Sequence, residues 1–169
     1  MTARPLGVLV ALAVLAADQA AKLAVLARFA DGPEATPVAP FLSLVLRWNR
    51  GISFSLFTQD TEAGRAALLA LTLAAIALLS WWLASTRSPV AALGLGAIIG
   101  GALGNAVDRV AHGAVVDYLD LHALGRHFFV FNLADAAINV GVALLIVDLA
   151  FGSGPGQRAG EAAARSKRG

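Results

Sequence analysis

The chain has 169 residues and a mass of 17.3 kDa; 58% of the residues are hydrophobic and only 14% are charged. Because a soluble domain carries about 25% charged residues, this composition, with a mean hydropathy of +0.73, argues against a soluble globular protein, a disordered chain and a nucleic-acid-binding module. The net charge is +2 and cysteine is absent, which excludes disulfides, thiolate metal sites and a cysteine nucleophile. We therefore expect an α-helical membrane protein.

Four stretches approach the roughly 20 apolar residues that a helix needs to span a bilayer. They cover about residues 6–26, 66–84, 90–107 and 133–150. The first is interrupted by Asp18, Gln19 and Lys22, whereas the second holds no charge. We predict four transmembrane helices in a single domain over residues 1–151. Residues 152–169 are rich in glycine, alanine and arginine without an apolar period, which predicts a disordered tail.

The distribution of basic residues predicts the orientation. Segments 1–6, 85–89 and 152–169 carry as many basic residues as segments 27–65 and 108–132, although they are less than half as long. Positive charge favours the cytoplasmic side, so we expect both termini inside and the two longer loops outside.

An alternative for the N-terminus is a cleaved signal peptide. Arg4 precedes an apolar run that ends at the small residues Ala16 and Ala17, as a signal peptide requires. Cleavage there would leave only three spans.

The two outer segments differ in pattern. Apolar and polar residues alternate over 42–47 and again over 52–57, on either side of Asn49-Arg50-Gly51. This pattern predicts a β-hairpin at the lipid surface, with a plain extracellular loop as the alternative. Segment 108–132 is interpreted as a loop with apolar anchors at Phe128, Phe129 and Phe131.

The third predicted span carries Gly96, Gly100 and Gly104 on one helical face. Small residues at this spacing let two helix backbones approach closely in lipid. We expect this face to pack tightly against a partner helix and to place Asn105 and Asp108 one turn further along.

Ionisable groups within a membrane span usually have a partner or a function, because each costs roughly 2.5–3.5 kcal/mol at a helix centre. Asp18 and Lys22 stand four residues apart, the spacing of an intrahelical ion pair, with substrate contact as the alternative. Asp108 and Arg109 form a charged pair that follows the third helix. Asp148 is near the cytoplasmic end of the fourth span and is expected to reach the interface.

Asp117 and Asp135 are the informative carboxylates, since both are expected near the outer membrane boundary. Two carboxyl groups that share a site do not both ionise easily. One can take a proton from water while the other donates to a carbonyl oxygen, as peptide hydrolysis requires. Structural or ion-conducting roles are the alternatives.

Other functional classes have weaker support in the sequence. His112, His122 and His127 lack the HExxH pattern of zinc proteases, although a metal site remains an alternative, and no GxSxG motif is present. An ion transporter would need polar residues at mid-span in several helices, and only Asp18 and Lys22 are that deep. A non-catalytic assembly factor is a further alternative.

Five motifs in one order resemble the lipoprotein signal peptidases (signal peptidase II), a family of bacterial four-helix aspartyl proteases. They cover about residues 15–145: Asp18-Gln19 with Lys22, Asn49 to Phe54, Gly100 to Asn105 with Asp108-Arg109, Val116-Asp117-Tyr118, and Phe131 to Asp135. The signal-peptide alternative loses support accordingly, because Asp18 and Lys22 match the family's first helix.

The resemblance implies cleavage of diacylglyceryl-modified prolipoproteins on the amino side of the lipidated cysteine. It implies that Asp117 and Asp135 are catalytic, and that the enzyme sits in the bacterial inner membrane with its active site near the extracytoplasmic face and a β-structured cradle beside it. The remaining matched residues are implied to support the dyad or the substrate: Asn49, Gly51, Asn105, Asp108, Arg109, Asn132, Asp18 and Lys22.

Two positions depart from the family pattern: Ser53 replaces the usual alanine and Tyr118 the usual phenylalanine. Both changes bear on substrate preference more than on activity. No cofactor, metal or nucleic acid is expected. The expected partners are lipid-modified prolipoproteins and membrane lipid, and the protein is expected to act as a monomer.

Overall fold

The computed structural model describes residues 3–30, 32, 35–51 and 62–151. Its four helices are each long and apolar enough to cross a membrane, which confirms the predicted helical membrane fold. They are α1 (Ala3–Phe29), α2 (Glu62–Ser85), α3 (Pro89–His112) and α4 (Leu133–Phe151). Ser53, the second strand of the predicted hairpin and the predicted tail lie outside the described residues.

Helix α3 occupies the centre of the bundle and packs against the other three helices. Most of its apolar stretch is buried, whereas Leu83 is the one buried residue of α2. The exposed faces of α1, α2 and α4 are rich in leucine, valine and tryptophan. In a membrane protein such faces contact lipid tails, which are as apolar as leucine.

Glycines on two faces of α3 set the close packing. A Cβ atom at Gly96 or Gly100 would overlap the backbone of Gly7 or Ala11 in α1. On the opposite face, a Cβ atom at Gly101 would overlap the backbone of α4. The expected tight packing of the Gly96 face is therefore observed, with α1 as the partner. A second small-residue face approaches α4, and this face was not predicted.

Helix α3 extends further than the sequence predicted. Ser88 caps its first turn by accepting a hydrogen bond from the backbone of Ala91, and Gly113 ends it in the left-handed conformation (φ 69°). The helix therefore runs one turn beyond the predicted boundary at 107. Asp108 and Arg109 lie within its last turns rather than after it.

Four antiparallel strands form one sheet in the order β1-β2-β3-β4: β1 (Ala35–Ala39), β2 (Leu42–Asn49), β3 (Val115–Ala123) and β4 (Arg126–Phe131). The strand predicted over 42–47 is confirmed, and its described partners are β1 and β3.

The loop predicted over 108–132 is instead the end of α3 followed by a β-hairpin. Its two-residue turn, Leu124-Gly125, has positive φ at both positions, as tight hairpins prefer. The first residues of β3 are buried in succession, so the sequence lacks the alternation that marks a strand with one buried face.

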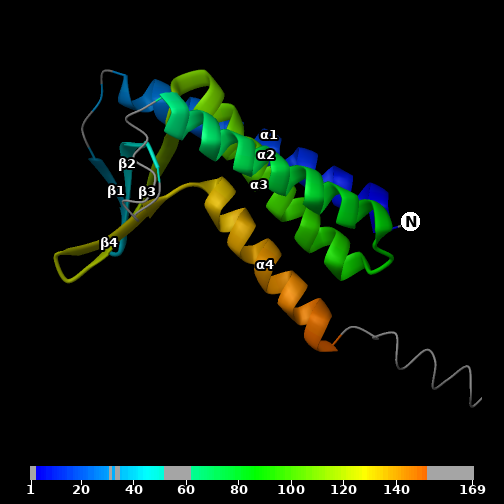
Figure 1. Cartoon of the computed structure of the whole chain (residues 1–169). Helices are drawn as coiled ribbons and strands as arrows, with labels where there is room; N and C mark the ends of the chain where they lie inside the picture. Colours follow the sequence, from blue (N-terminus) through cyan, green and yellow to red (C-terminus); the bar gives the residue numbers. More distant parts are fainter. Residues whose placement is uncertain (1–2, 31, 33–34, 52–61, 152–169) are drawn as a thin grey trace, which may run out of the picture.

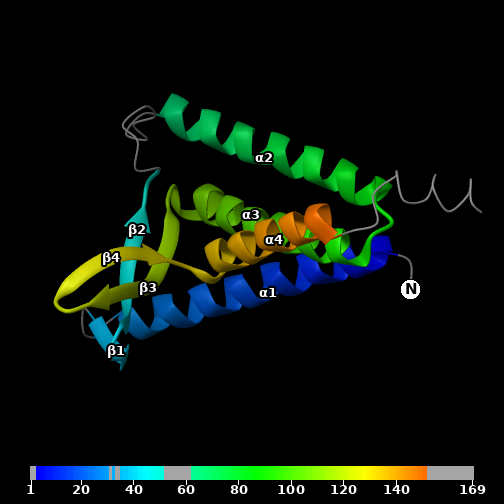
Figure 2. The same cartoon turned by 90° about the horizontal axis from the view of Figure 1, so that it is seen from below.

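The sheet lies at one end of the bundle, and the N-terminus lies at the other (Figures 1 and 2). The end of α1 joins the sheet through a hydrophobic cluster built on Val25, Val116 and Tyr118. The chain enters α4 directly from β4. The last turns of α3, the first turn of α4 and the ends of β2 and β3 therefore converge at this end.

Candidate active site

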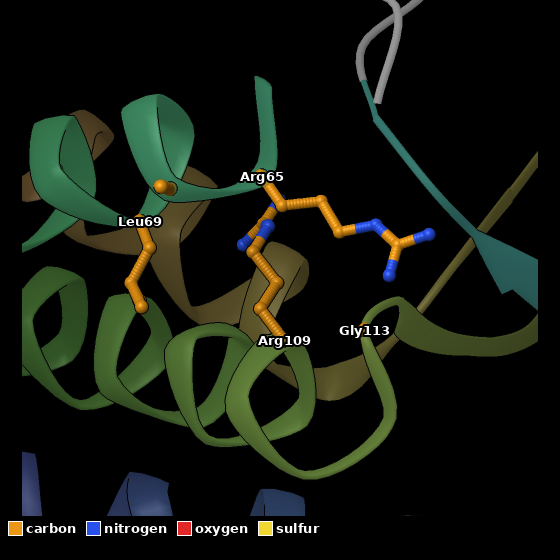
Figure 3. Close-up of a pocket in the computed structure, with 5 residues that line it drawn as sticks. Arg65, Leu69, Arg109 and Gly113 are labelled. Atoms are coloured by element: carbon orange, nitrogen blue, oxygen red, sulfur yellow. The ribbon is translucent and has the colours of Figure 1, made fainter. Parts of the chain in front are cut away.

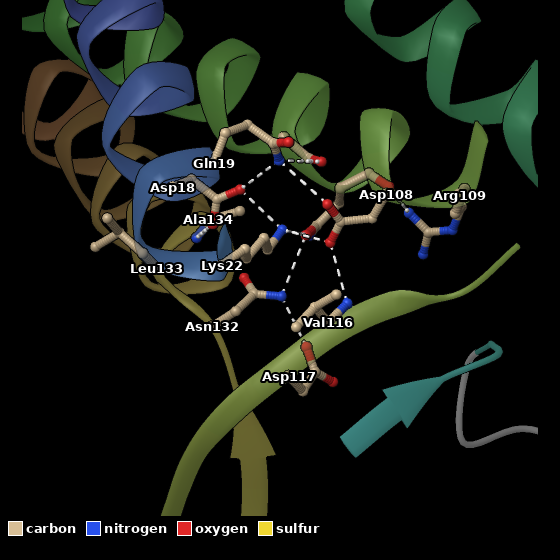
Figure 4. Close-up of polar contacts among 12 residues, drawn as sticks. Asp18, Gln19, Lys22, Asp108, Arg109, Val116, Asp117, Asn132, Leu133 and Ala134 are labelled. Atoms are coloured by element: carbon tan, nitrogen blue, oxygen red, sulfur yellow. Dashed lines mark hydrogen bonds and ion pairs between the residues drawn. The ribbon is translucent and has the colours of Figure 1, made fainter. Parts of the chain in front are cut away.

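Lys22 lies at the centre of a buried ion cluster between α1 and α3 (Figure 4). Its Nζ atom is 2.8 Å from Asp18 Oδ2, 2.7 Å from Asp108 Oδ2 and 3.1 Å from Asn105 Oδ1. The side chains of Lys22, Asp18 and Asp108 are almost fully buried. An ammonium group has three donors, so the hydrogen-bonding capacity of Lys22 is filled, and the predicted Asp18–Lys22 pair is observed with Asp108 as a third member.

Gln19 extends this cluster toward α3. Its Nε2 atom donates to Asp108 Oδ1 at 3.1 Å, to the carbonyl of Gly104 at 3.2 Å and to Asp18 Oδ2 at 3.3 Å. Asp108 Oδ2 in turn accepts the backbone N–H of Val116 at 3.0 Å. The ion cluster thus fixes α1, α3 and the start of β3 relative to one another.

The first turn of α4 is held by side chains from three parts of the chain. The backbone N–H of Leu133 donates to the Tyr118 hydroxyl at 3.3 Å, and that of Ala134 donates to Asp18 Oδ1 at 2.9 Å. The N–H of Asp135 donates to Asn132 Oδ1 at 2.9 Å. These are the free donors of a helix N-terminus, and each has an acceptor. The first turn of α4, which carries Asp135, is consequently fixed relative to α1 and β3.

Asn132 links Asp117 and Asp135. Its Nδ2 atom donates to Asp117 Oδ1 at 2.7 Å, and its backbone N–H donates to Asp135 Oδ2 at 3.2 Å. Asn105 contacts Asp135 directly and Asp117 through Asn132. Its Nδ2 atom donates to Asp135 Oδ1 at 2.9 Å, and its Oδ1 atom accepts from Asn132 at 3.2 Å. Two residues distant along the chain are therefore brought into one network.

Asp117 is buried at the start of β3 and accepts hydrogen bonds from two amides. In addition to Asn132, Asn49 Nδ2 donates to its Oδ2 atom at 2.9 Å. The pKa of Asp117 is raised to about 6, chiefly by burial and with a smaller contribution from the negative charge of Asp135, while the amides of Asn49 and Asn132 oppose the shift. The carboxyl therefore exchanges protons close to neutral pH, as a general acid or base requires.

The remaining predicted supporting residues surround the carboxylates. The backbone N–H of Gly51 donates to Asn49 Oδ1 at 3.0 Å, which orients the amide toward Asp117. Arg109 donates from Nη1 to the carbonyl of Asn105 at 3.3 Å and is attracted by the charges of Asp135, Asp108 and Asp117.

The other candidate residues do not join this network. His122 contacts Ser43, His127 contacts Asp120, and His112 lies against the Trp48 ring. The described residues contain no group of three or more histidine, cysteine, aspartate or glutamate side chains that could hold a metal ion.

Asp148 lies outside the site as well. It accepts a hydrogen bond from Ser88, the N-cap residue of α3, which places it at the end of the bundle opposite to the sheet.

Two contributors were not predicted from the sequence. Gln19 carried no assigned role, although its position next to Asp18 was the available signal. Tyr118 was noted only as a departure, yet its hydroxyl group binds the first N–H of α4. The contacts of Gln19 with Asp108 and of Tyr118 with Leu133 join residues that are distant in the chain, so their spacing in the sequence did not indicate them.

Four membrane-spanning helices and two carboxylates joined by asparagine side chains where the helices meet a small sheet are the features of a membrane enzyme. The family model described as signal peptidase (SPase) II matches residues 10–151. The chain belongs to this family of lipoprotein signal peptidases, which makes it a membrane protease of lipoprotein processing. This finding favours a protease over the transporter and assembly-factor alternatives.

Individual relatives agree with the family match. The chain is 49% identical over 156 residues to the lipoprotein signal peptidase of Methylobacterium sp. (strain 4-46), covering 91% of this chain and 94% of the relative. It is 51% identical over 150 residues to that of Beijerinckia indica subsp. indica, covering 88% and 89%. A solved structure described as a bacterial membrane enzyme has a TM-score of 0.73 and 27% identity, covering 85% of this chain and 91% of that one.

Proposed function

We propose that Asp117 and Asp135 form the catalytic pair of an aspartyl endopeptidase. The observation that carries this proposal is their shared network: Asn132 binds both carboxylates, and Asn105 binds Asp135 and Asn132. One carboxylate takes a proton from water as it attacks the peptide carbonyl, and the other donates a proton to the carbonyl oxygen. Neither a covalent intermediate nor a metal is needed.

The substrate in this proposal is a prolipoprotein whose cysteine carries a diacylglyceryl group, cut on the amino side of that cysteine. Such a substrate has an apolar signal helix and a lipid tail, so it reaches the enzyme from within the bilayer. Asp117 lies on β3 and Asp135 in the first turn of α4, where the helices meet the sheet. That position supports a cut at the boundary between lipid and water.

The same proposal includes the orientation and organisation of the protein. Both termini lie in the cytoplasm, and the sheet and carboxylates lie at the extracytoplasmic face of the inner membrane. The excess of arginine and lysine in segments 1–6, 85–89 and 152–169 supports this orientation. The protein acts as a monomer in membrane lipid, with residues 1–151 as one peptidase domain.

Cleavage of a lipidated precursor by D117N and D135N tests the catalytic pair. We expect turnover to fall by about 10²–10⁴-fold in each, the range for loss of a general acid or base. D120N provides the matched control, because Asp120 is also buried on β3 but contacts His127 outside the network. It should keep turnover within a few-fold of the unmodified protein. Near-normal turnover in a folded D117N or D135N protein would overturn the assignment.

A further inference from the structure

A small pocket opens between the first turn of α2 and the last turns of α3 (Figure 3). Its volume is about 100 Å³, and its lining residues are Arg65, Ala66, Leu69, Arg109 and Gly113. Arg65 extends from α2 over Gly113, while Arg109 rises from α3 toward α2 (Figure 3). Two guanidinium groups therefore reach one cavity whose other walls are apolar.

Arg109 brings an unused hydrogen-bond donor to this region. Its Nε atom is buried and has no hydrogen-bond partner within the described part of the chain. Its Nη1 atom is engaged by the carbonyl of Asn105. Buried donors in native proteins nearly always have an acceptor, so an acceptor group from a bound molecule is expected beside Arg109.

The charges around Arg109 favour a neutral acceptor over an anion. Asp108, Asp117 and Asp135 already attract this guanidinium group, and they would repel a phosphate or carboxylate placed beside it. A carbonyl oxygen accepts the same hydrogen bonds without added charge. A carbonyl attached to an alkyl chain also suits the apolar walls formed by Ala66 and Leu69. An ester satisfies all of these requirements.

We propose that this pocket binds the ester carbonyls of the substrate's diacylglyceryl group, and that Arg65 and Arg109 together recognise the lipid modification. The inference rests on the proposed function. Arg109 is shared between the pocket and the carboxylate network. The lipid would therefore lie beside Asp117 and Asp135, as expected when the lipidated cysteine directly follows the bond that is cut.

The test compares two precursors that differ only in the lipid linkage. One carries the natural diester, and the other carries a diether in which both carbonyl oxygens are absent. For the unmodified protein, we expect kcat/KM to be about tenfold or more higher for the diester, as for sites that recognise a substrate by hydrogen bonding. In R65M this ratio should fall several-fold toward one, because methionine fills the space of the arginine stem without its donors, while Arg109 keeps its own.

R126M is the matched control, since Arg126 is exposed at the start of β4. It should keep the diester-to-diether ratio of the unmodified protein. R65K provides a second variant, whose lysine retains the charge but not the planar set of donors, and its ratio should fall part of the way. If R65M does not fold, R65K alone tests the role of Arg65.

The outcomes separate this inference from the proposed function. A ratio near one in the unmodified protein, or an unchanged ratio in the folded arginine variants, would overturn the role of Arg65 while cleavage itself stands. If the unmodified protein cleaves neither precursor, the proposed function fails first.

Discussion

The two pairs of aspartates at the sheet end of the bundle have different partners. Asp18 and Asp108 both form direct ion pairs with Lys22, at 2.8 and 2.7 Å. Asp117 and Asp135 receive hydrogen bonds from amides of Asn49, Asn105 and Asn132, and no ion pair between a lysine or arginine and either of them is found among the described residues.

This difference separates the two pairs by the contacts that hold them. Lys22 joins Asp18 on α1 to Asp108 on α3 through direct ion pairs, as a structural cluster does. Burial disfavours the charged form of a carboxylate that has no cation in direct contact, and the pKa of Asp117 is raised for this reason although the amides of Asn49 and Asn132 oppose the rise. We infer that the Lys22 cluster is structural and that the amide-held pair carries the chemistry.

The largest expected effect on stability follows from removing the cation. K22M leaves Asp18 and Asp108 buried without their shared partner, and loss of one partner of a buried ion pair costs about 3–5 kcal/mol. We expect K22M to unfold far more readily in detergent micelles, as measured by tryptophan fluorescence on heating. R28M is the control, because Arg28 is exposed on the same helix. Equal stability of the two variants would contradict a structural role for the cluster.

The next largest effect is expected for Asn132, the residue that links Asp117 and Asp135. N132A removes the hydrogen bonds to Asp117 and Asn105 and the cap on Asp135. We expect turnover to fall by about 10²-fold, since small displacements of reacting groups cost this much.

N139A serves as the comparison on the same helix, because Asn139 is exposed and binds only the backbone carbonyl of Asp135. Turnover of a lipidated precursor is measured for both variants. If N132A and N139A have equal turnover, the link between the two carboxylates is not needed for catalysis.

The pH dependence of activity tests the effect of the Asn49 hydrogen bond on the pKa of Asp117. The Asn49 amide lowers the pKa of Asp117, which burial raises to about 6. N49A removes this hydrogen bond, so the pKa of Asp117 should rise further, and the protonated form should persist to higher pH. In the pH profile of kcat/KM, the limb due to Asp117 should move upward. A downward or absent shift would contradict the assigned hydrogen bond.

The smallest effect is expected for Tyr118. Y118F leaves the backbone N–H of Leu133 without its side-chain acceptor, at a cost of about 0.5–1.5 kcal/mol. Thermal unfolding should record this small loss, while turnover stays within a few-fold. A turnover loss above tenfold would show that the hydroxyl acts in the chemistry rather than in the capping of α4.

The sequence predicted features that depend on local pattern. Hydropathy located the four helices, and the spacing of Gly96, Gly100 and Gly104 predicted a close helix contact that the structure places on α1. The Asp18–Lys22 pair followed from helical spacing alone. These features need only the geometry of one helix.

Features that depend on tertiary packing were not predicted. The hairpin of β3 and β4 was interpreted as a loop, because the first residues of β3 are buried on both faces and do not alternate. The bonds from Gln19 to Asp108 and from Ala134 to Asp18 join segments that are close only in the fold. The sequence named Asp117 and Asp135 as candidates, and Asn49, Asn105 and Asn132 as supporting residues, but only the fold shows the hydrogen bonds that join them.

The most direct measurement is an infrared titration of the carboxyl groups from pH 4 to pH 8, in the unmodified protein and in D117N. We expect a protonated-carboxyl band that disappears as the pH rises, with a midpoint near pH 6, and that is missing from D117N. A midpoint near pH 4, or the same band in D117N, would show that Asp117 does not hold a proton near neutral pH, and would contradict the division between the two pairs of aspartates.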